Sequence, residues 1–384
     1  VMRIDRTYTL ETLARLVQVN SINPTLAPGA PGEKEIADFI AASLRASGLI
    51  VEIFEPVRGR TSVLGRLAGA GGGRSLMLNA HCDTVDIAGM AEPFSGAIRD
   101  GKLYGRGSYD MKGSLAACMA AAKALKTSGI ALRGDVLVAA VADEEYGSLG
   151  TSDMLTRIKP DGAIVTEPTA LEVCLAHKGY LWVEVVITGR AAHGSKFQSG
   201  IDANMKMGRF LAELANLERD LRARPPHPLV GPPSLHAAML HGGSGLSTYA
   251  ATCSLQIERR TVPGETEAQA VGEIQAIVDR ISAADPDFHA AVRPFFVRDP
   301  FEVPAAAEIV KAVDRAAAKV RGTPAKHIGD TPWMDAALLH AAGVETVVCG
   351  AAGTGAHADV EWVDVESVLA LAEILAEAAV DYCA

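Results

Sequence analysis

Apolar positions in the first part of the chain follow two spacings, one helical and one continuous over a few residues. Segments 10–16, 33–47 and the Ala-rich 111–125 have helical periodicity, and Gly48 provides a stop signal after the second. Short apolar runs between Gly-rich turns are typical of buried strands, and they occur at 50–54, 62–67, 75–78, 136–142 and 163–166. Strands that alternate with helices predict an α/β domain with a mostly parallel sheet and helices on both faces.

The pattern changes after Lys178. The elements predicted there are, in chain order, strand 181–188, helix 201–221, strands 234–239 and 252–259, helix 265–282 and strand 289–296. This order is that of a ferredoxin-like split βαβ unit, an α+β domain. The first pattern then resumes with helices at 304–320 and 332–341, a strand at 345–348 and a helix at 365–379. We therefore expect one domain formed by 1–177 and 297–384, with a second domain, 178–296, inserted into it.

Length, charge and cysteine content narrow the class of protein. The 384 residues are too many for one ordinary core, which supports two domains. The formal net charge of −10 argues against a nucleic-acid-binding surface and gives no basic face for a membrane. No apolar run approaches the roughly 20 residues of a membrane span, and no secretory signal is visible. Six cysteines without paired spacing are typical of reduced thiols, so we expect a soluble, cytoplasmic protein.

Six acidic and imidazole side chains stand where apolar runs end abruptly, namely His81, Asp110, Glu144, Glu145, Glu167 and His357. Strands that stop at such residues indicate an open α/β sheet whose carboxyl edge holds a ligand site. Two imidazoles and four carboxylates are a set that two divalent metals can share, with one carboxylate left as a base. Because the chain has no Cys₄ set, the pattern favours a catalytic metal centre over a structural one.

Taken singly, these residues leave other interpretations open. His81 can be a histidine satisfied at a strand end, although Asp83, two positions on and on the same face, is placed to hydrogen-bond its ring. Asp110 precedes a predicted helix and by itself would fit an N-cap. Glu144 and Glu145 can be a surface acid pair, but adjacent carboxylates after so apolar a strand repel each other unless cations or protons compensate them. As neighbours they point in different directions, so one can bind metal while the other handles a proton.

Six longer motifs occur in order along the chain: NAHCDTV, PFSGAIRDGKLYGRGSYDMKGSLAA, DEEYGSLGT, TEPT, ERRTVPGE and AHADVEWV. Together they resemble the co-catalytic zinc metallopeptidases of the acetylornithine deacetylase and succinyl-diaminopimelate desuccinylase family, which includes aminoacylases and glutamate carboxypeptidases. The resemblance covers essentially the whole chain. It implies a zinc-peptidase-like α/β domain, an inserted lid and dimerisation domain, and a homodimer formed through that insert.

The resemblance also implies two divalent metal ions and the residues that hold them. Asp110 would bridge both ions, with His81 and Glu167 completing one site and Glu145 and His357 completing the other. The expected ions are Zn²⁺, with Co²⁺ or Mn²⁺ as alternatives.

Catalysis in the family implies roles for the neighbouring acids. Glu144 would be the general base, which takes a proton from a water shared by the metals and returns it to the leaving amine. Asp83 would orient the metal-binding ring of His81. The family also tends to have a cis peptide bond after the bridging aspartate, here between Asp110 and Met111.

Two further residues are assigned to the substrate by the same resemblance, and a third is expected there from its glycine-rich surroundings. His193, in GRAAHGS, matches the histidine that polarises the amide oxygen and in relatives typically reaches the active site of the partner subunit. Arg260, in ERR, matches the arginine that grips the substrate carboxylate, for which a guanidinium fork is suited, whereas Arg259 should point away. Gly353, in a Gly-rich stretch, is expected to line the pocket and let substrate approach the backbone.

Departures from the family pattern bear on the substrate. Where the desuccinylases have an arginine pair before Gly-Ser, this chain has His177-Lys178-Gly179-Tyr180, which argues against a second substrate carboxylate. We therefore expect hydrolysis of the amide bond of an N-acyl amino acid, as in acetylornithine deacetylase. A carboxypeptidase or dipeptidase of the same family is one alternative. A non-catalytic, metal-stabilised binding protein is another, and the presence of Glu144 argues against it.

Overall fold

The computed structural model describes residues 1–87 and 89–384, which form two compact units. The first unit consists of Val1–Leu175, Val303–Ile328 and Met334–Ala384. The second consists of Ala176–Glu302 and Gly329–Trp333. The second unit is thus inserted into the sequence of the first. Its main segment begins at Ala176 and ends at Glu302. The bounds expected from the sequence pattern are 178 and 296.

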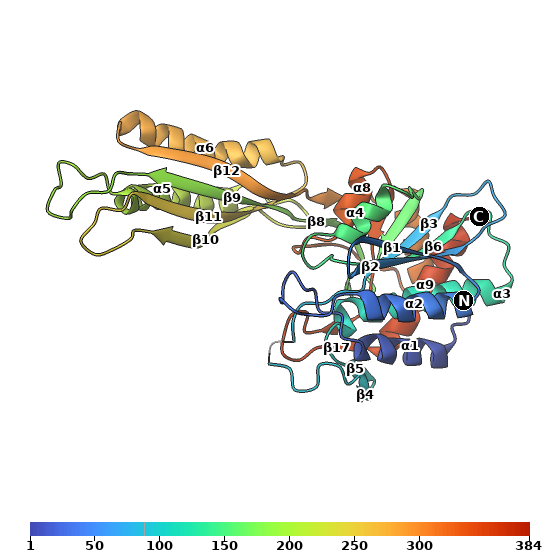
Figure 1. Cartoon of the computed structure of the whole chain (residues 1–384). Coiled ribbons are helices and arrows are strands. Elements are labelled where there is room, and N and C mark those ends of the chain that lie inside the picture. The colour runs from blue at the N-terminus through green and yellow to red at the C-terminus, as the bar shows by residue number, and fades with distance from the viewer. Residues whose placement is uncertain (88) are drawn as a thin grey trace. The chain divides into compact units, whose positions relative to one another are not determined.

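A mixed sheet forms the centre of the first unit (Figure 1). Its strands, in spatial order, are β1 (Ile50–Val57), β2 (Arg60–Leu67), β6 (Val136–Val141), β3 (Leu76–His81), β7 (Gly162–Val165), β15 (Glu345–Val348) and β8 (Val173–His177). The four strands from β6 to β15 pair in parallel, whereas β1, β2 and β8 pair antiparallel with their neighbours. The expected parallel arrangement therefore holds for the centre of the sheet. The edge differs because β1 and β2 are joined by a tight turn, which only antiparallel strands allow.

Helices cover both faces of this sheet (Figure 1). On one face α3 (Gly113–Ser128) and α9 (Val365–Tyr382) pack against each other and against β3, and on the other α4 (Leu149–Leu155) packs against α8 (Ala336–Ala341). Most of α3 is buried, because its alanines and glycine allow close approach to its neighbours. The remaining helices are α1 (Arg6–Gln18), α2 (Lys34–Ala46) and α7 (Glu308–Arg321). The helices and strands predicted for this unit from apolar spacing are present, with ends shifted by a few residues.

A second, smaller sheet in this unit is not predicted by the sequence pattern. Its four short antiparallel strands lie in the order β16 (Gly353–Thr354), β17 (Trp362–Asp364), β5 (Lys102–Tyr104) and β4 (Ala97–Arg99). Strands of two or three residues are too short to produce a recognisable apolar alternation. The sheet matters for the site because β5 leads into the loop before Asp110, and His357 lies between β16 and β17. The pairing of β17 with β5 therefore joins two loops that are far apart in the sequence.

The second unit has the predicted order of strand, helix, two strands, helix and strand. These are β9 (Gly179–Thr188), α5 (Ala203–Ala223), β10 (Ser234–Gly242), β11 (Thr252–Thr261), α6 (Glu267–Ala284) and β12 (His289–Arg298). The strands form an antiparallel sheet in the order β10-β11-β9-β12, which confirms the ferredoxin-like topology. One face of this sheet and the two helices share a core that includes Val183, Phe210 and Ile274. The short β13 (Phe301–Glu302) and β14 (His327–Asp330) pair with β8.

The six cysteines are reduced thiols, as their scattered spacing predicts. All six are unpaired and buried, so they act as small apolar side chains of the core. Among the described residues, no helix is both long and apolar enough to cross a membrane.

Candidate metal centre

The central parallel strands bring four of the six strand-end residues together. His81 is the last residue of β3, Glu144 and Glu145 follow β6, and Glu167 follows β7. Since parallel strands end at the same edge of a sheet, these side chains converge there. Ligand atoms of His81, Glu144 and Glu167 lie within 4.8 Å of one another, as do those of His81, Asp110 and Glu145.

Asp110 lies between two groups of side chains. Its Oδ1 is 3.1 Å from Nε2 of His81, which is also 3.6 Å from Oε1 of Glu167. Its Oδ2 is 3.4 Å from Nε2 of His357, which in turn is 3.1 Å from Oε2 of Glu145. Each oxygen of one carboxylate thus faces a different imidazole and carboxylate pair. This is the grouping that the family resemblance implies for two metal ions.

The alternative interpretation of Asp110 as a helix cap does not hold. Asp110 lies in the kinked segment η1 (Ser108–Lys112), where its own backbone is not helical (φ −118°, ψ 91°), and α3 begins after it at Gly113. The N-cap residue of α3 is Lys112, which makes no side-chain cap bond, and the carboxylate of Asp110 is directed at the two histidines. The peptide bond between Asp110 and Met111 is cis, as the resemblance implies.

A buried carboxylate that the sequence analysis missed, Glu361, holds the loop that carries Asp110. Its Oε1 accepts the main-chain N–H groups of Tyr109 at 2.9 Å and Asp110 at 3.0 Å. Its Oε2 accepts the N–H of Gly107 at 3.0 Å and Nη1 of Arg106 at 2.7 Å. Glu361 is 1% exposed, so these four bonds stabilise its charge in place of water. It stands in the AHADVEWV motif, but only the pairing of the small sheet shows which loop it contacts.

Asp83 supports the cluster in a different way from the one predicted. Nδ1 of His81 donates to the main-chain carbonyl of Asp83 at 2.9 Å, whereas the Asp83 carboxylate is 3.7 Å from that nitrogen. The carbonyl can only accept, so Nδ1 carries a hydrogen, and Nε2, which faces Asp110, is the ring nitrogen that can release its proton to a metal. The Asp83 carboxylate instead accepts the N–H groups of Glu144 at 3.1 Å and Glu145 at 3.3 Å. It therefore fixes the main chain of the two adjacent glutamates.

A buried polar network lies behind Asp83, and the sequence analysis did not predict it. Nδ2 of Asn23 donates to Asp83 at 2.9 Å and to Asp143 at 3.0 Å. Nη2 of Arg60 donates to Asp143 at 2.8 Å and to Glu33 at 2.6 Å. Asp83 and Asp143 stand in two of the six motifs, but Asn23, Glu33 and Arg60 stand in none, so the sequence does not indicate these contacts. The network anchors Asp143, the residue immediately before Glu144. Asp143 has a left-handed φ of 69°.

Neighbouring carboxylates make both imidazoles strongly basic. Hydrogen bonds with Asp110 and Glu145 raise the pKa of His357 to about 10. Burial lowers the pKa of His81, but the charge of Glu167 and the hydrogen bond with Asp110 outweigh burial, and the net pKa is well above its ordinary value. Both rings therefore hold protons at neutral pH when no other cation is near.

Among the carboxylates of the cluster, the pKa of Glu144 is raised and that of Asp110 is lowered. Burial, and after it the charge of Glu167, raises the pKa of Glu144 well above its ordinary value. Burial also acts to raise the pKa of Asp110, but hydrogen bonds with His357 and His81 lower it below the ordinary range. Four carboxylates thus share two imidazole charges, and the site is short of positive charge. Nitrogen and oxygen donors in this excess suit divalent cations such as zinc, cobalt or manganese.

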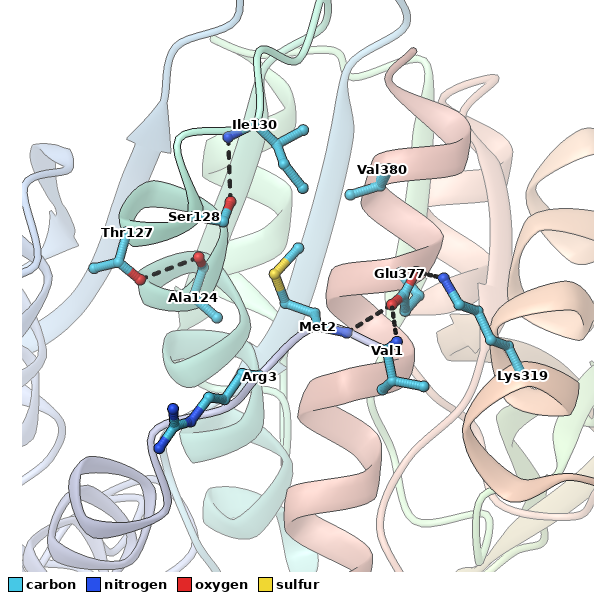
Figure 2. Close-up of a pocket in the computed structure, with 10 residues that line it drawn as sticks. All are labelled: Val1, Met2, Arg3, Ala124, Thr127, Ser128, Ile130, Lys319, Glu377 and Val380. Carbon is cyan, nitrogen blue, oxygen red and sulfur yellow. Dashed lines mark hydrogen bonds and ion pairs between the residues drawn. The ribbon is translucent and has the colours of Figure 1, made fainter.

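Figure 2 shows a cavity of about 550 Å³ that lies elsewhere on the first unit. The carboxylate of Glu377 within it accepts from the main-chain nitrogen of Met2 at 2.6 Å and from Nζ of Lys319 at 2.7 Å. It also lies 3.6 Å from the amino group of Val1. The acid of this cavity is therefore already paired with cations and donors, and none of the six cluster residues lines it. The metal centre remains the candidate functional site.

Of the residues predicted to contact substrate, His193 and Arg260 belong to the second unit and Gly353 to the first. His193 is exposed, and its Nδ1 lies 2.8 Å from Oγ of Ser195. At Gly353 an added Cβ would collide with the carbonyl oxygen of Trp362 and would lie 2.6 Å from the ring of Tyr109. Packing within the small sheet therefore accounts for this glycine, without any approach of substrate.

Arg259 and Arg260 point to opposite faces of β11. Arg259 is buried, and its Nη2 donates to Glu265 at 2.7 Å and to Glu273 at 3.2 Å. Arg260 is half-buried on the other face, where its Nε donates to Glu258 at 2.7 Å. The prediction that Arg259 points away from Arg260 is confirmed.

Comparisons with known proteins show which sequences and folds the chain is similar to. The model of the family described as peptidase family M20/M25/M40 matches residues 77–381. An acetylornithine deacetylase of Proteus mirabilis (strain HI4320) is 32% identical over 275 residues, which are 69% of this chain and 70% of that protein. The aminopeptidase PepT of Bacillus cereus ATCC 10987 has a TM-score of 0.79 and 20% identity, with 99% of both chains covered. The YXEP protein of Bacillus subtilis, described as a dinuclear metal binding peptidase, has a TM-score of 0.74 and 17% identity over 98% of this chain and 97% of its own.

Proposed function

The chain belongs to peptidase family M20/M25/M40, and we propose that it hydrolyses the amide bond of an N-acyl amino acid. This is the reaction that the name of the similar acetylornithine deacetylases describes. It is a metal-dependent hydrolase. Its substrate and the roles of its residues are what we propose. The observation that carries the proposal is the position of Asp110, with one oxygen toward His81 and the other toward His357. A single carboxylate between two nitrogen and oxygen groups suits a pair of cations that act together.

The proposed ligands are the residues of these two groups. His81, Glu167 and Asp110 would hold one divalent ion, and Glu145, His357 and Asp110 the other, with zinc as the proposed metal. When bound, such ions polarise a carbonyl oxygen and make water acidic near neutral pH. The main-chain carbonyl of Asp83 keeps the Nε2 lone pair of His81 available for a metal.

Glu144 is the proposed general base. Its N–H is held by Asp83, and its carboxylate lies within 4.8 Å of ligand atoms of His81 and Glu167 without belonging to either group around Asp110. Burial raises its pKa, and nearby cations would lower it again, so the two effects bring the group toward the range useful for proton transfer. The carboxylate would take a proton from water and deliver it to the nitrogen of the leaving amine.

Residues of the second unit would contact the substrate. Arg260 would bind the substrate carboxylate through its outer nitrogens, since its Nε is already bonded to Glu258. His193, which is exposed, would polarise the amide oxygen in the active site of a partner subunit. We propose a homodimer formed through this unit, supported by β10, an edge strand on which Met239 is 51% and Leu240 is 52% exposed. A fully active monomer by light scattering would contradict the role of His193 in a partner.

Removal of a terminal residue from a short peptide is the second candidate function. It is favoured by the likeness to PepT, which covers nearly the whole of both chains. An amide that links an acyl group to an amino acid and one that links two amino acids differ only in the free amine, so the same cluster can act on either.

A substrate panel on metal-reconstituted protein separates these functions. The panel varies the acyl group and the amino acid independently and includes dipeptides with the same C-terminal residue. Hydrolysis of N-acyl amino acids but not of dipeptides supports the deacylase. Equal, measurable rates for the parent and the Glu144→Gln variant would rule out Glu144 as the base, whereas hydrolysis of no member of the panel would leave the metal-stabilised binding protein.

A further inference from the structure

The second unit has an aromatic cluster on the face of its sheet opposite to α5 and α6. Both helices pack on the other face, over residues such as Leu181 and Val183. Alternate residues of β9 and β11 point away from the helices and are half-buried, and the outward residues of β12 up to Phe295 are exposed. The cluster, called here the aromatic face, consists of Tyr180, Trp182, Phe295 and Phe296.

The rings of the aromatic face lie in mutual contact around Trp182. Its ring centroid is 4.9 Å from that of Phe296, 5.6 Å from that of Tyr180 and 6.0 Å from that of Phe295. A bulge in β12 between Pro294 and Phe296 allows two consecutive phenylalanines to contact Trp182. Phe295 is 45% exposed, so the cluster presents apolar surface to solvent. Exposed apolar surface rimmed by polar side chains is a feature of ligand-binding grooves.

Arg260 is part of the same surface. Its guanidinium carbon lies 4.8 Å from the ring centroid of Tyr180, the residue directly opposite it on β9. Glu258 links Arg260 to the rings, because its Oε1 accepts Nε of Arg260 at 2.7 Å and its Oε2 accepts Nε1 of Trp182 at 3.1 Å. The outer two nitrogens of Arg260 have no hydrogen-bond partner among residues 1–87 and 89–384. They are available to an anion that lies beside the rings.

We propose that the aromatic face binds the side chain of the amino acid whose carboxylate Arg260 holds, so that the enzyme prefers N-acyl amino acids with aromatic or large apolar side chains. The inference rests on the proposed function, since it takes the role of Arg260 from there. In an amino acid the side chain starts one carbon from the carboxylate. A phenyl or indole ring of a substrate therefore reaches the spacing of about 4.5–7 Å at which aromatic rings pair.

The charges beside the rings disfavour a cationic side chain. The guanidinium carbon of Arg298 lies 4.4 Å from the ring centroid of Phe296, so arginines flank the aromatic face through both Tyr180 and Phe296. Glu258 is already paired with Arg260, and Glu184, further along β9, is paired with Arg293 at 2.8 Å. An ammonium group such as that of ornithine would meet like charge there, whereas a phenyl or indole ring would not.

The test uses ligands that contain a carboxylate but no amide. Binding of 3-phenylpropionate and of propionate to the full-length, zinc-loaded protein is measured by titration calorimetry for the parent, Trp182→Ala and Phe295→Ala. Val186→Ala, further along the same face of β9, is the matched control. We expect 3-phenylpropionate to bind the parent at least about tenfold more tightly than propionate, as burial of a ring against rings predicts. That ratio should fall toward one in Trp182→Ala, fall partly in Phe295→Ala and stay unchanged in Val186→Ala.

Two outcomes overturn the inference: no preference for 3-phenylpropionate in the parent, or a preference that survives in Trp182→Ala and Phe295→Ala alike. If Trp182→Ala does not fold by circular dichroism, Phe295→Ala and the parent ratio decide. Hydrolysis of N-acetyl-L-phenylalanine and N-acetyl-L-alanine is measured in parallel. Ring-dependent binding without any hydrolysis would contradict the proposed function and support the aromatic face, whereas hydrolysis without ring preference would do the reverse.

Discussion

Glu361 accepts the main-chain N–H of Asp110 at 3.0 Å, and so holds in place the residue whose two oxygens face both imidazoles. Glu361 lies just before β17, at the end of the loop that carries His357, so one carboxylate connects the two loops. The spacing between Asp110 and His357 is thereby set by the protein itself. A metal pair would enter a site whose ligands are already positioned.

Substitution Glu361→Gln tests this coupling. The amide is neutral and cannot accept on both ends, so Arg106 and the loop N–H groups lose buried partners. We expect a loss of about 3 kcal/mol in the free energy of unfolding, as for a broken buried ion pair, and metal affinity weaker by about tenfold or more. Urea denaturation and zinc titration measure the two effects. In the control Glu366→Gln, at an exposed acid paired with Arg6, stability should change by less than about 0.5 kcal/mol.

Glu144 and Glu145 are adjacent, yet their substitutions should have different consequences. Glu144→Gln should lower kcat by about 10²–10⁴-fold with two ions still bound per chain, because only the proton transfer is lost. Glu145→Gln should lose one of the two ions, because a ligand beside His357 is removed. Steady-state kinetics and metal analysis of the purified variants give both readouts. Loss of metal in Glu144→Gln would make Glu144 a ligand and contradict its role as base.

The sequence alone predicts those parts of the site that apolar spacing and short motifs can specify. The ends of β3, β6 and β7 place His81, Glu145 and Glu167 at one edge because parallel strands leave little choice of arrangement. By position alone, Asp110 would be interpreted as a helix cap. Its real place depends on the contact of β5 with β17, strands of three residues each.

Residues that act through packing are the ones the sequence does not predict. Glu361 and Asn23 are ordinary polar residues until the fold places each beside several buried donors or acceptors. The partner of the His81 ring differs from the predicted one for a related reason. From its position in the sequence, Asp83 could accept from the ring of His81 through its carboxylate or through its main-chain carbonyl. Only the local backbone conformation decides that the carbonyl is the acceptor.

Metal binding should strengthen with pH through the neutral range. His357 has a pKa of about 10 in the metal-free protein, so it is protonated at pH 7–9 and must lose that proton to bind a metal. Affinity should therefore rise about tenfold per pH unit for each proton displaced, and level off near pH 10. Zinc titration in buffers of different ionisation enthalpy counts the protons released. His357→Ala should release one fewer.

The metal-free protein should show the opposite trend in stability. The folded pKa of His357 lies above its ordinary value of 6.5, so its ion pairs stabilise the fold fully below pH 6.5 and are lost as pH rises toward 10. The melting temperature of chelator-treated protein should accordingly fall between pH 6.5 and 9.5. A rise over that range in the parent, or an identical fall in His357→Ala, would show that this ring is not responsible.

Arg259 and Arg260 provide a matched pair for the role of the second unit. Arg260→Lys keeps a charge but loses the fork that fits a carboxylate, so KM should rise by about tenfold or more with little change in melting temperature. Arg259→Lys keeps a charge at a buried position but loses the fork that bonds Glu265 and Glu273, which Arg224 still contacts, so it should lower stability by about 1.5–3 kcal/mol. Its KM should stay near that of the parent under conditions where the variant is folded. If instead Arg259→Lys raises KM and Arg260→Lys does not, the substrate carboxylate is held by a group other than Arg260, since β11 presents the two arginines on opposite faces.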